Sequence, residues 1–90
     1  MNFTGSNNNR FWRVLNWNIR GLNAESKWDA IKSKAIEQQC DIICIQETKK
    51  ETFDDQFIRK ICPRGFDKYQ FLPSIGRSGG CITIWKSSMF

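Results

Sequence analysis

The sequence contains no histidine, only two prolines and no apolar run long enough to cross a membrane. Without an imidazole, a catalytic mechanism that uses histidine as its base cannot be completed within these 90 residues. No apolar stretch near the N-terminus has the form of a signal peptide. We therefore expect an intracellular protein, in the nucleus or the cytoplasm, with no membrane attachment.

Cysteine occurs four times, but no two cysteines have the CxxC spacing of a metal or redox motif. Because there is no histidine to complete a ligand set, the sequence gives no support to a zinc site. We expect reduced thiols that act mostly as small core residues, although the spacing alone leaves a disulfide open. The four residues are Cys40, Cys44, Cys62 and Cys81.

The composition is that of one small folded domain, with 40% hydrophobic and 26% charged residues. Fourteen basic residues against nine acidic ones give a net charge of +5. This excess favours an anionic partner such as nucleic acid or a phosphorylated substrate, although scattered solvated lysines would give the same total. The sequence leaves the oligomeric state open.

The order of predicted elements is strand, helix, strand, helix, strand, strand. Residues 1–10 are polar and low in complexity and predict a disordered leader, whereas residues 11–90 predict a single α/β domain. Alternating apolar residues predict the first strand around residues 13–19. Ser26 is a plausible cap of an amphipathic helix that extends to about Gln39. We expect this helix to cover the two strands with Trp28, Ile31 and Ile36.

The second half of the chain continues this pattern. The continuous apolar residues 42–45 predict a strand covered on both faces. Thr52 is a plausible cap of a second, short helix. Residues 68–72 and 81–86 predict two further strands joined by the loop 73–80, in an antiparallel hairpin.

The predicted fold class is α/β with a mixed sheet. A strand–helix–strand unit implies two parallel neighbours, to which the final hairpin adds antiparallel strands. Two short helices cannot cover both faces of a four-stranded sheet, so we expect a fragment of a larger domain. Trp12, Trp17, Trp28 and Trp85 are expected in the core, and Lys27, Lys32 and Lys34 in solvent.

Two polar residues stand where consecutive predicted strands end. Asn18 closes the first strand, and Glu47 follows the second. Because ligands of open α/β sheets bind at the carboxyl ends of the strands, we expect these side chains at one edge. An amide oxygen and a carboxylate suit Mg²⁺, and Lys49 would lie near substrate phosphates. The alternative is a solvated loop carboxylate without a ligand.

Three segments carry a family resemblance: "NWNIRGLN", "DIICIQETK", and "GRSGG" followed by "ITIW". In order and spacing they resemble the start of the exonuclease–endonuclease–phosphatase family, which has the DNase I-like fold. Within that family, the strongest likeness is to the endonuclease domains of plant LINE-type (non-LTR) retrotransposons. The resemblance implies the N-terminal, incomplete part of a four-layered α/β sandwich that hydrolyses DNA phosphodiesters with Mg²⁺ (or Mn²⁺).

The resemblance also implies roles for individual residues. Asn18 matches the family's active-site asparagine, and Glu47 matches its metal-binding glutamate. The family's later tyrosine, asparagine, aspartate and histidine residues have no match, so this chain alone is expected to be inactive and to need the missing C-terminal part of the domain. Arg20 stands where some DNA-repair members carry an aspartate, a pattern associated with the retrotransposon branch.

The basic residues near these motifs are candidates for nucleic-acid binding: Arg20, Lys49 and Arg77, with Lys50 as a possible neighbour. The glycines of "GRSGG" either cradle a phosphate or, as we favour, form a tight connection between strands. Two other functions stay open. The chain is a non-catalytic relic that binds nucleic acid, or it is part of a family phosphatase that acts on lipid or nucleotide phosphates.

Overall fold

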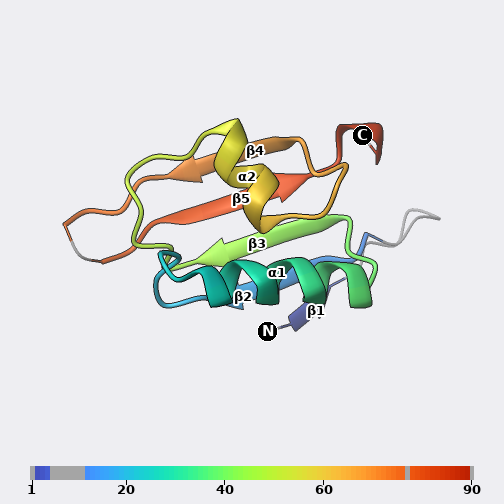
Figure 1. Cartoon of the computed structure of the whole chain (residues 1–90), viewed down its shortest axis with the longest axis horizontal. Coiled ribbons are helices and arrows are strands. Elements are labelled where there is room, and N and C mark those ends of the chain that lie inside the picture. The colour runs from blue at the N-terminus through green and yellow to red at the C-terminus, as the bar shows by residue number, and fades with distance from the viewer. Residues whose placement is uncertain (1, 5–11, 77, 90) are drawn as a thin grey trace.

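The computed structural model describes residues 2–4, 12–76 and 78–89, with only the backbone described for residues 2–4. These residues form one mixed sheet with two helices on the same face (Figure 1). The elements are β1 (Asn2–Thr4), β2 (Val14–Asn18), α1 (Glu25–Glu37), β3 (Ile42–Gln46), α2 (Asp55–Ile61), β4 (Lys68–Leu72), β5 (Cys81–Trp85) and the 3₁₀ helix η1 (Ser87–Met89). Neither described helix is long and apolar enough to cross a membrane.

The strand order is β1-β2-β3-β5-β4. β2 and β3 are parallel neighbours joined through α1, as the strand–helix–strand pattern predicted. β4 and β5 form the predicted antiparallel hairpin, and β5 also pairs with β3. β5 therefore lies inside the sheet, between β3 and β4, so that the hairpin joins the parallel pair through its second strand (Figure 1).

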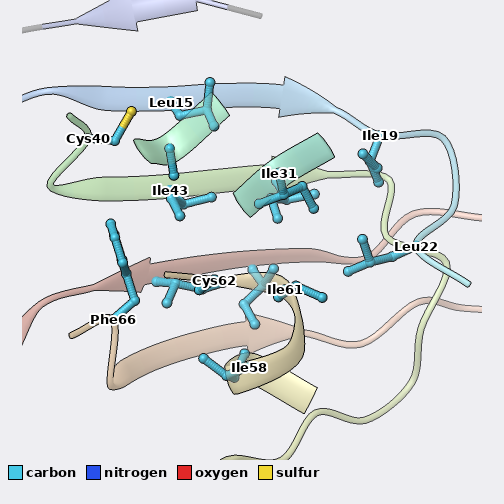
Figure 2. Close-up of a cluster of buried hydrophobic side chains, with 14 residues drawn as sticks. Leu15, Ile19, Leu22, Ile31, Cys40, Ile43, Ile58, Ile61, Cys62 and Phe66 are labelled. Carbon is cyan, nitrogen blue, oxygen red and sulfur yellow. The ribbon is translucent and has the colours of Figure 1, made fainter. Parts of the chain in front are cut away.

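The hydrophobic core lies between one face of the sheet and the two helices (Figure 2). Because β-strand side chains alternate between faces, every second residue of the central strands points toward the helices. The sheet contributes the fully or nearly fully buried residues Leu15, Ile43, Ile45, Ile82 and Ile84, and the helices contribute Ile31, Ala35, Ile58 and Ile61. This packing holds β2, β3 and β5 in a fixed register.

The opposite face of the sheet is not covered by the described residues. Ile42 and Cys44 of β3 point to that face and are only half-buried. The prediction that residues 42–45 are covered on both faces is therefore wrong for the described part of the chain. The four cysteines are free, as expected; Cys40 and Cys62 are buried, whereas Cys44 and Cys81 are half-buried on the open side.

Neither helix begins at its predicted cap: α1 begins earlier in the sequence than predicted, and α2 begins later. α1 begins at Glu25, after Ala24, so Ser26 lies inside the first turn and is not the cap. α2 is capped by Asp54, whose carboxylate accepts a hydrogen bond from the Phe57 N–H at 2.8 Å, and not by Thr52. An aspartate in the first position outside a helix satisfies an otherwise unpaired backbone donor.

Three other expectations need correction. Ile36 is 61% exposed and does not cover the strand pair, unlike Ile31. The tryptophans are half-buried rather than fully in the core; Trp28 packs beside the core and donates from Nε1 to the carbonyl of Leu22 at 2.6 Å. Residues 2–4 form β1 and pair with β2, so the prediction of a disordered leader is wrong for these three residues. Residues 1 and 5–10 lie outside the described residues.

Candidate active site

The carboxyl ends of β2 and β3 meet at one edge of the sheet. Asn18 is the last residue of β2 and is paired in register with Gln46, after which Glu47 follows directly. The Ile19 N–H continues the pairing with a 3.0 Å hydrogen bond to the Gln46 carbonyl. Asn18 and Glu47 thus lie at the same end of neighbouring parallel strands, as predicted, and both are exposed.

The turn after β2 is tied to the segment after β3 by backbone hydrogen bonds. The Gly21 N–H donates to the Glu47 carbonyl at 2.7 Å, and the Leu22 N–H donates to the Thr48 carbonyl at 2.9 Å. Leu22 is fully buried, so this side of the edge is anchored in the core. The position of Glu47 is consequently set by the turn that carries Asn18.

The glycine-rich loop supports the same segment from the other side. The N–H groups of Thr48 and Lys49 donate to the carbonyls of Gly80 and Gly79, at 3.1 and 3.0 Å. Gly80 approaches so closely that a Cβ atom there would lie 2.6 Å from the Thr48 Oγ1. The two glycine carbonyls therefore tie the loop to the segment after β3, which is the role of a tight connection between strands.

The edge concentrates unusual backbone conformations. Four non-glycine residues in the described chain have a positive φ, and three of them lie here: Arg20 (55°), Glu47 (55°) and Lys49 (56°). The left-handed conformation costs about 1–2 kcal/mol for such residues. A residue keeps this conformation only where contacts with the surrounding structure hold it, and such residues cluster at functional sites. The hydrogen bonds on both sides of Glu47 supply that constraint.

Two of the predicted cations lie at the edge. Arg20 and Lys49 are exposed. The stem of Lys49 crosses the turn, because its Cδ is 3.7 Å from the place that a Cβ on Gly21 would occupy. Arg77 lies outside the described residues. Lys50 turns away from the edge instead, since its Nζ is 4.2 Å from the ring centroid of Phe57.

One contributor to the edge, Lys27, was not recognised from the sequence. Instead of being solvated, its ammonium donates to three consecutive carbonyls, those of Ile19, Arg20 and Gly21, at 2.9, 3.1 and 3.0 Å. The available signal was its place in the first turn of a helix, where the helix dipole disfavours a cation. Such a placement indicates a specific acceptor nearby.

The donors for a metal at this edge are few. No group of three or more histidine, cysteine, aspartate or glutamate side chains could hold a metal within the part of the chain that the structure describes. The ends of β2 and β3 offer the carboxylate of Glu47 and the amides of Asn18 and its paired neighbour Gln46. These hard oxygen donors suit Mg²⁺ or Mn²⁺ better than zinc or copper.

Comparison with known proteins places this arrangement in context. The pattern of the Endonuclease/Exonuclease/phosphatase family matches residues 15–90. The chain is 35% identical, over 74% of its length, to DNA-(apurinic or apyrimidinic site) endonuclease 2 of Schizosaccharomyces pombe, of which it spans only 14%.

Two solved structures share the fold. The chain matches the AP endonuclease LMAP from Leishmania major with a TM-score of 0.63 and 24% identity, over 93% of this chain and 26% of that one. It matches the catalytic domain of Xenopus laevis APE2 with a TM-score of 0.55 and 28% identity, over 83% and 23%. Because the family match covers most of the sequence, including Asn18 and Glu47, the chain belongs to the Endonuclease/Exonuclease/phosphatase family, as its motifs predicted, and its mixed sheet is part of that family's DNase I-like α/β fold.

Proposed function

We propose that this chain is the N-terminal part of a divalent-metal-dependent DNA endonuclease that hydrolyses phosphodiesters. The observation that carries the proposal is the position of Asn18 and Glu47 at one end of adjacent parallel strands, beside the exposed cations Arg20 and Lys49. The names of the relatives, which are DNA endonucleases acting at apurinic or apyrimidinic sites, support DNA as the substrate class.

The residues at the edge fit a divalent metal only in part. Mg²⁺ typically takes one or two carboxylates and completes its shell with waters and substrate phosphate oxygens. Glu47 would supply the carboxylate, and Asn18 would supply an amide group beside it. When bound, the metal would stabilise the negative charge that develops on the phosphate. One carboxylate alone predicts weak binding.

The remaining roles fall to groups that the backbone holds in place. Asn18 would orient the substrate phosphate or an attacking water through its amide. Arg20 and Lys49 would neutralise neighbouring phosphates, contacts that position DNA without reading its sequence. Because Glu47 has a left-handed backbone conformation held by hydrogen bonds on two sides, its backbone would not need to be ordered when substrate binds.

Metal binding by the intact chain is the direct test. Mn²⁺ should broaden the backbone NMR signals of Asn18 and Glu47 before all others, and Glu47→Ala should abolish this selectivity. Glu37→Ala removes an exposed carboxylate from the far end of α1 and should change nothing. Broadening that is the same in Glu47→Ala as in the unaltered chain would refute the metal site.

Catalysis by this chain alone is not expected. The chain spans 14% of the curated relative and about a quarter of the two solved structures, so most of their catalytic domain has no counterpart here. General acid–base assistance is typically worth about 10²–10⁴ in rate. We expect no Mg²⁺-dependent nicking of supercoiled plasmid above a Glu47→Ala control. Nicking that disappears in Glu47→Ala would overturn this and indicate a minimal nuclease.

A non-catalytic, nucleic-acid-binding role is the second candidate. It is favoured by the small donor set, because the described edge combines exposed cations with only one carboxylate. DNA binding would then be weak and sensitive to salt. Arg20→Ala and Lys49→Ala should each reduce the slope of log K against log salt by about 0.9 if each contacts a phosphate. Unchanged slopes would remove both residues from the interface.

Within this proposal we place the origin of the chain in a LINE-type retrotransposon. The support is the motif itself, in which Arg20 replaces a carboxylate with a cation that seeks phosphate. The genomic reading frame tests the idea. Downstream aspartate- and histidine-bearing motifs followed by a reverse transcriptase would support it, and a frame without a reverse transcriptase would contradict it.

A further inference from the structure

We propose that Lys27 is a positioning residue of the candidate active site, and that its ammonium fixes the backbone of both Arg20 and Glu47. The inference rests on the proposed function for its consequences, but its structural basis is independent. Lys27 Nζ donates to the carbonyls of Ile19, Arg20 and Gly21 at 2.9, 3.1 and 3.0 Å. An ammonium has three donors, so every one of them is used.

Three consecutive carbonyls do not converge on one point in a regular strand or helix. They do so here because Arg20 (φ 55°) and Gly21 (φ 103°) both adopt positive φ. Carbonyl dipoles that point together repel one another unless a positive charge lies between them. The ammonium therefore stabilises the turn at Arg20, a non-glycine residue for which the left-handed conformation costs about 1–2 kcal/mol.

The position of Lys27 in α1 indicates that its hydrogen bonds to the three carbonyls outweigh the unfavourable interaction of a cation with the N-terminus of the helix. Lys27 lies in the first turn of α1, where unpaired N–H groups and the helix dipole disfavour a cation. The N-cap residue, Ala24, provides no side-chain acceptor. The lysine is thus in an unfavourable place for an exposed helix residue and a favourable one for binding the carbonyls of the preceding turn.

A short path of hydrogen bonds leads from Lys27 to Glu47. The ammonium holds the Gly21 carbonyl, and the N–H of Gly21 donates to the Glu47 carbonyl at 2.7 Å. The following residue, Leu22, is tied in the same way to Thr48. If the turn relaxed, the Glu47 backbone would lose its partner on that side and would no longer be held next to the turn after β2.

Lys27 itself is not a substrate ligand in this arrangement, because none of its donors is left for a phosphate. This separates it from Arg20 and Lys49, which are exposed at the same edge. Supporting residues of this kind typically change metal affinity by 10–100-fold when they are removed. For a site with one carboxylate we expect a change at the lower end, about 10-fold.

The test compares three variants of the 90-residue chain. Lys27→Met keeps the length of the side chain and removes the ammonium. Lys27→Arg keeps the charge, but its planar guanidinium cannot direct three donors at one set of converging carbonyls. Lys34→Met is the matched control, because Lys34 is on the same helix and only approaches Glu37 at 4.0 Å. Backbone ¹³C shifts, amide exchange and Mn²⁺ titration are measured on each.

In Lys27→Met, the backbone ¹³C chemical shifts of Arg20 and Glu47 should move away from the values typical of the left-handed conformation. Exchange of the Gly21 and Leu22 amides should quicken by about 10-fold, whereas the β3 amides keep their protection. Lys27→Arg should show a smaller change of the same kind, and Lys34→Met none. Mn²⁺ affinity should fall by about 10-fold in Lys27→Met.

The proposal is overturned if Lys27→Met matches Lys34→Met in shifts and exchange. If Lys27→Met does not fold, Lys27→Arg decides: signals identical to those of the unaltered chain overturn the proposal, and selective loss at Arg20 and Glu47 supports it. If the unaltered chain shows no Glu47-dependent Mn²⁺ effect, the proposed metal function fails. The positioning role is still decided by shifts and exchange, which need no metal.

Discussion

Replacing Gly80 by alanine probes the closest approach at the candidate active site. A Cβ atom at residue 80 would lie 2.6 Å from the Thr48 Oγ1 and 3.2 Å from the Ser74 backbone nitrogen. Thr48 is fully buried and Ser74 is 7% exposed, so neither can move freely. We expect Gly80→Ala to push the glycine-rich loop away from the segment that carries Glu47.

The cost can be estimated in two parts. Gly80 has φ +84°, and an alanine in the left-handed region costs about 1–2 kcal/mol. Overpacking at a tight contact adds typically 1–3 kcal/mol. The total is about 2–5 kcal/mol. Gly76→Ala is the matched control in the same loop, since Gly76 has φ +62° and no atom within 4 Å of the added Cβ. It should cost only about 1 kcal/mol.

Urea unfolding followed by circular dichroism measures both variants, and the difference should be about 2 kcal/mol. Thr48→Ala removes the oxygen that causes the clash, so in this background the penalty of Gly80→Ala should fall toward that of Gly76→Ala. The reasoning is refuted if Gly80→Ala costs no more than Gly76→Ala, because the close approach would then have no energetic effect.

Two further predictions concern α2 and its surroundings. Asp54→Ala should lower the free energy of unfolding by about 1 kcal/mol because the N-cap bond to Phe57 is lost, whereas Thr52→Ala should change it by less than about 0.5 kcal/mol; equal effects in urea unfolding would contradict this assignment. Burial raises the pKa of the Cys62 thiol from 9.0 to about 12, so at pH 8 iodoacetamide should modify Cys62 at least about 100-fold more slowly than the half-buried Cys81, as read by peptide mass spectrometry. Because the folded chain keeps this proton while the unfolded chain loses it, the contribution of Cys62 to stability is complete below pH 9 and is lost as the pH rises toward 12. Similar labelling rates for both thiols would show that the interior opens readily.

Local patterns in the sequence were sufficient for most of the elements. The alternating residues of β2 and the short apolar β4 were predicted within one or two residues, because the two-residue period of a half-buried strand is strong over short stretches. The start of α1 was missed because its N-cap residue, Ala24, has no side chain that can cap, and the start of α2 was missed because both Thr52 and Asp54 are chemically able to cap. Only the structure shows that Asp54, and not Thr52, reaches the Phe57 N–H.

Long-range relations were harder to predict. The position of β5 between β3 and β4 depends on pairing between segments far apart in sequence, and an apolar strand pattern is the same whether the strand is central or at an edge. Ile36 fits the helical period and yet is 61% exposed, so periodicity alone did not show which residues of α1 are covered by the rest of the chain. The carbonyl contacts of Lys27 depend on the turn geometry and have no local signature beyond its helix position.

The positions of Asn18 and Glu47 were predictable for a different reason, because topology fixes where the strands end. Parallel strands joined by one helix place their carboxyl ends at the same edge, whatever their side chains. The buried residues Ile43 and Ile45 anchor β3 on the helix-covered face, so the strand cannot slide without losing its core contacts. Glu47 follows β3 directly. Its backbone has a left-handed conformation, and hydrogen bonds from the turn after β2 and from the glycine-rich loop hold the segment that contains it. The backbone of Glu47 is therefore held by the core and by the neighbouring turns together, and we expect Gly80→Ala and Lys27→Met to weaken Mn²⁺ binding less than Glu47→Ala does, but more than Lys34→Met does.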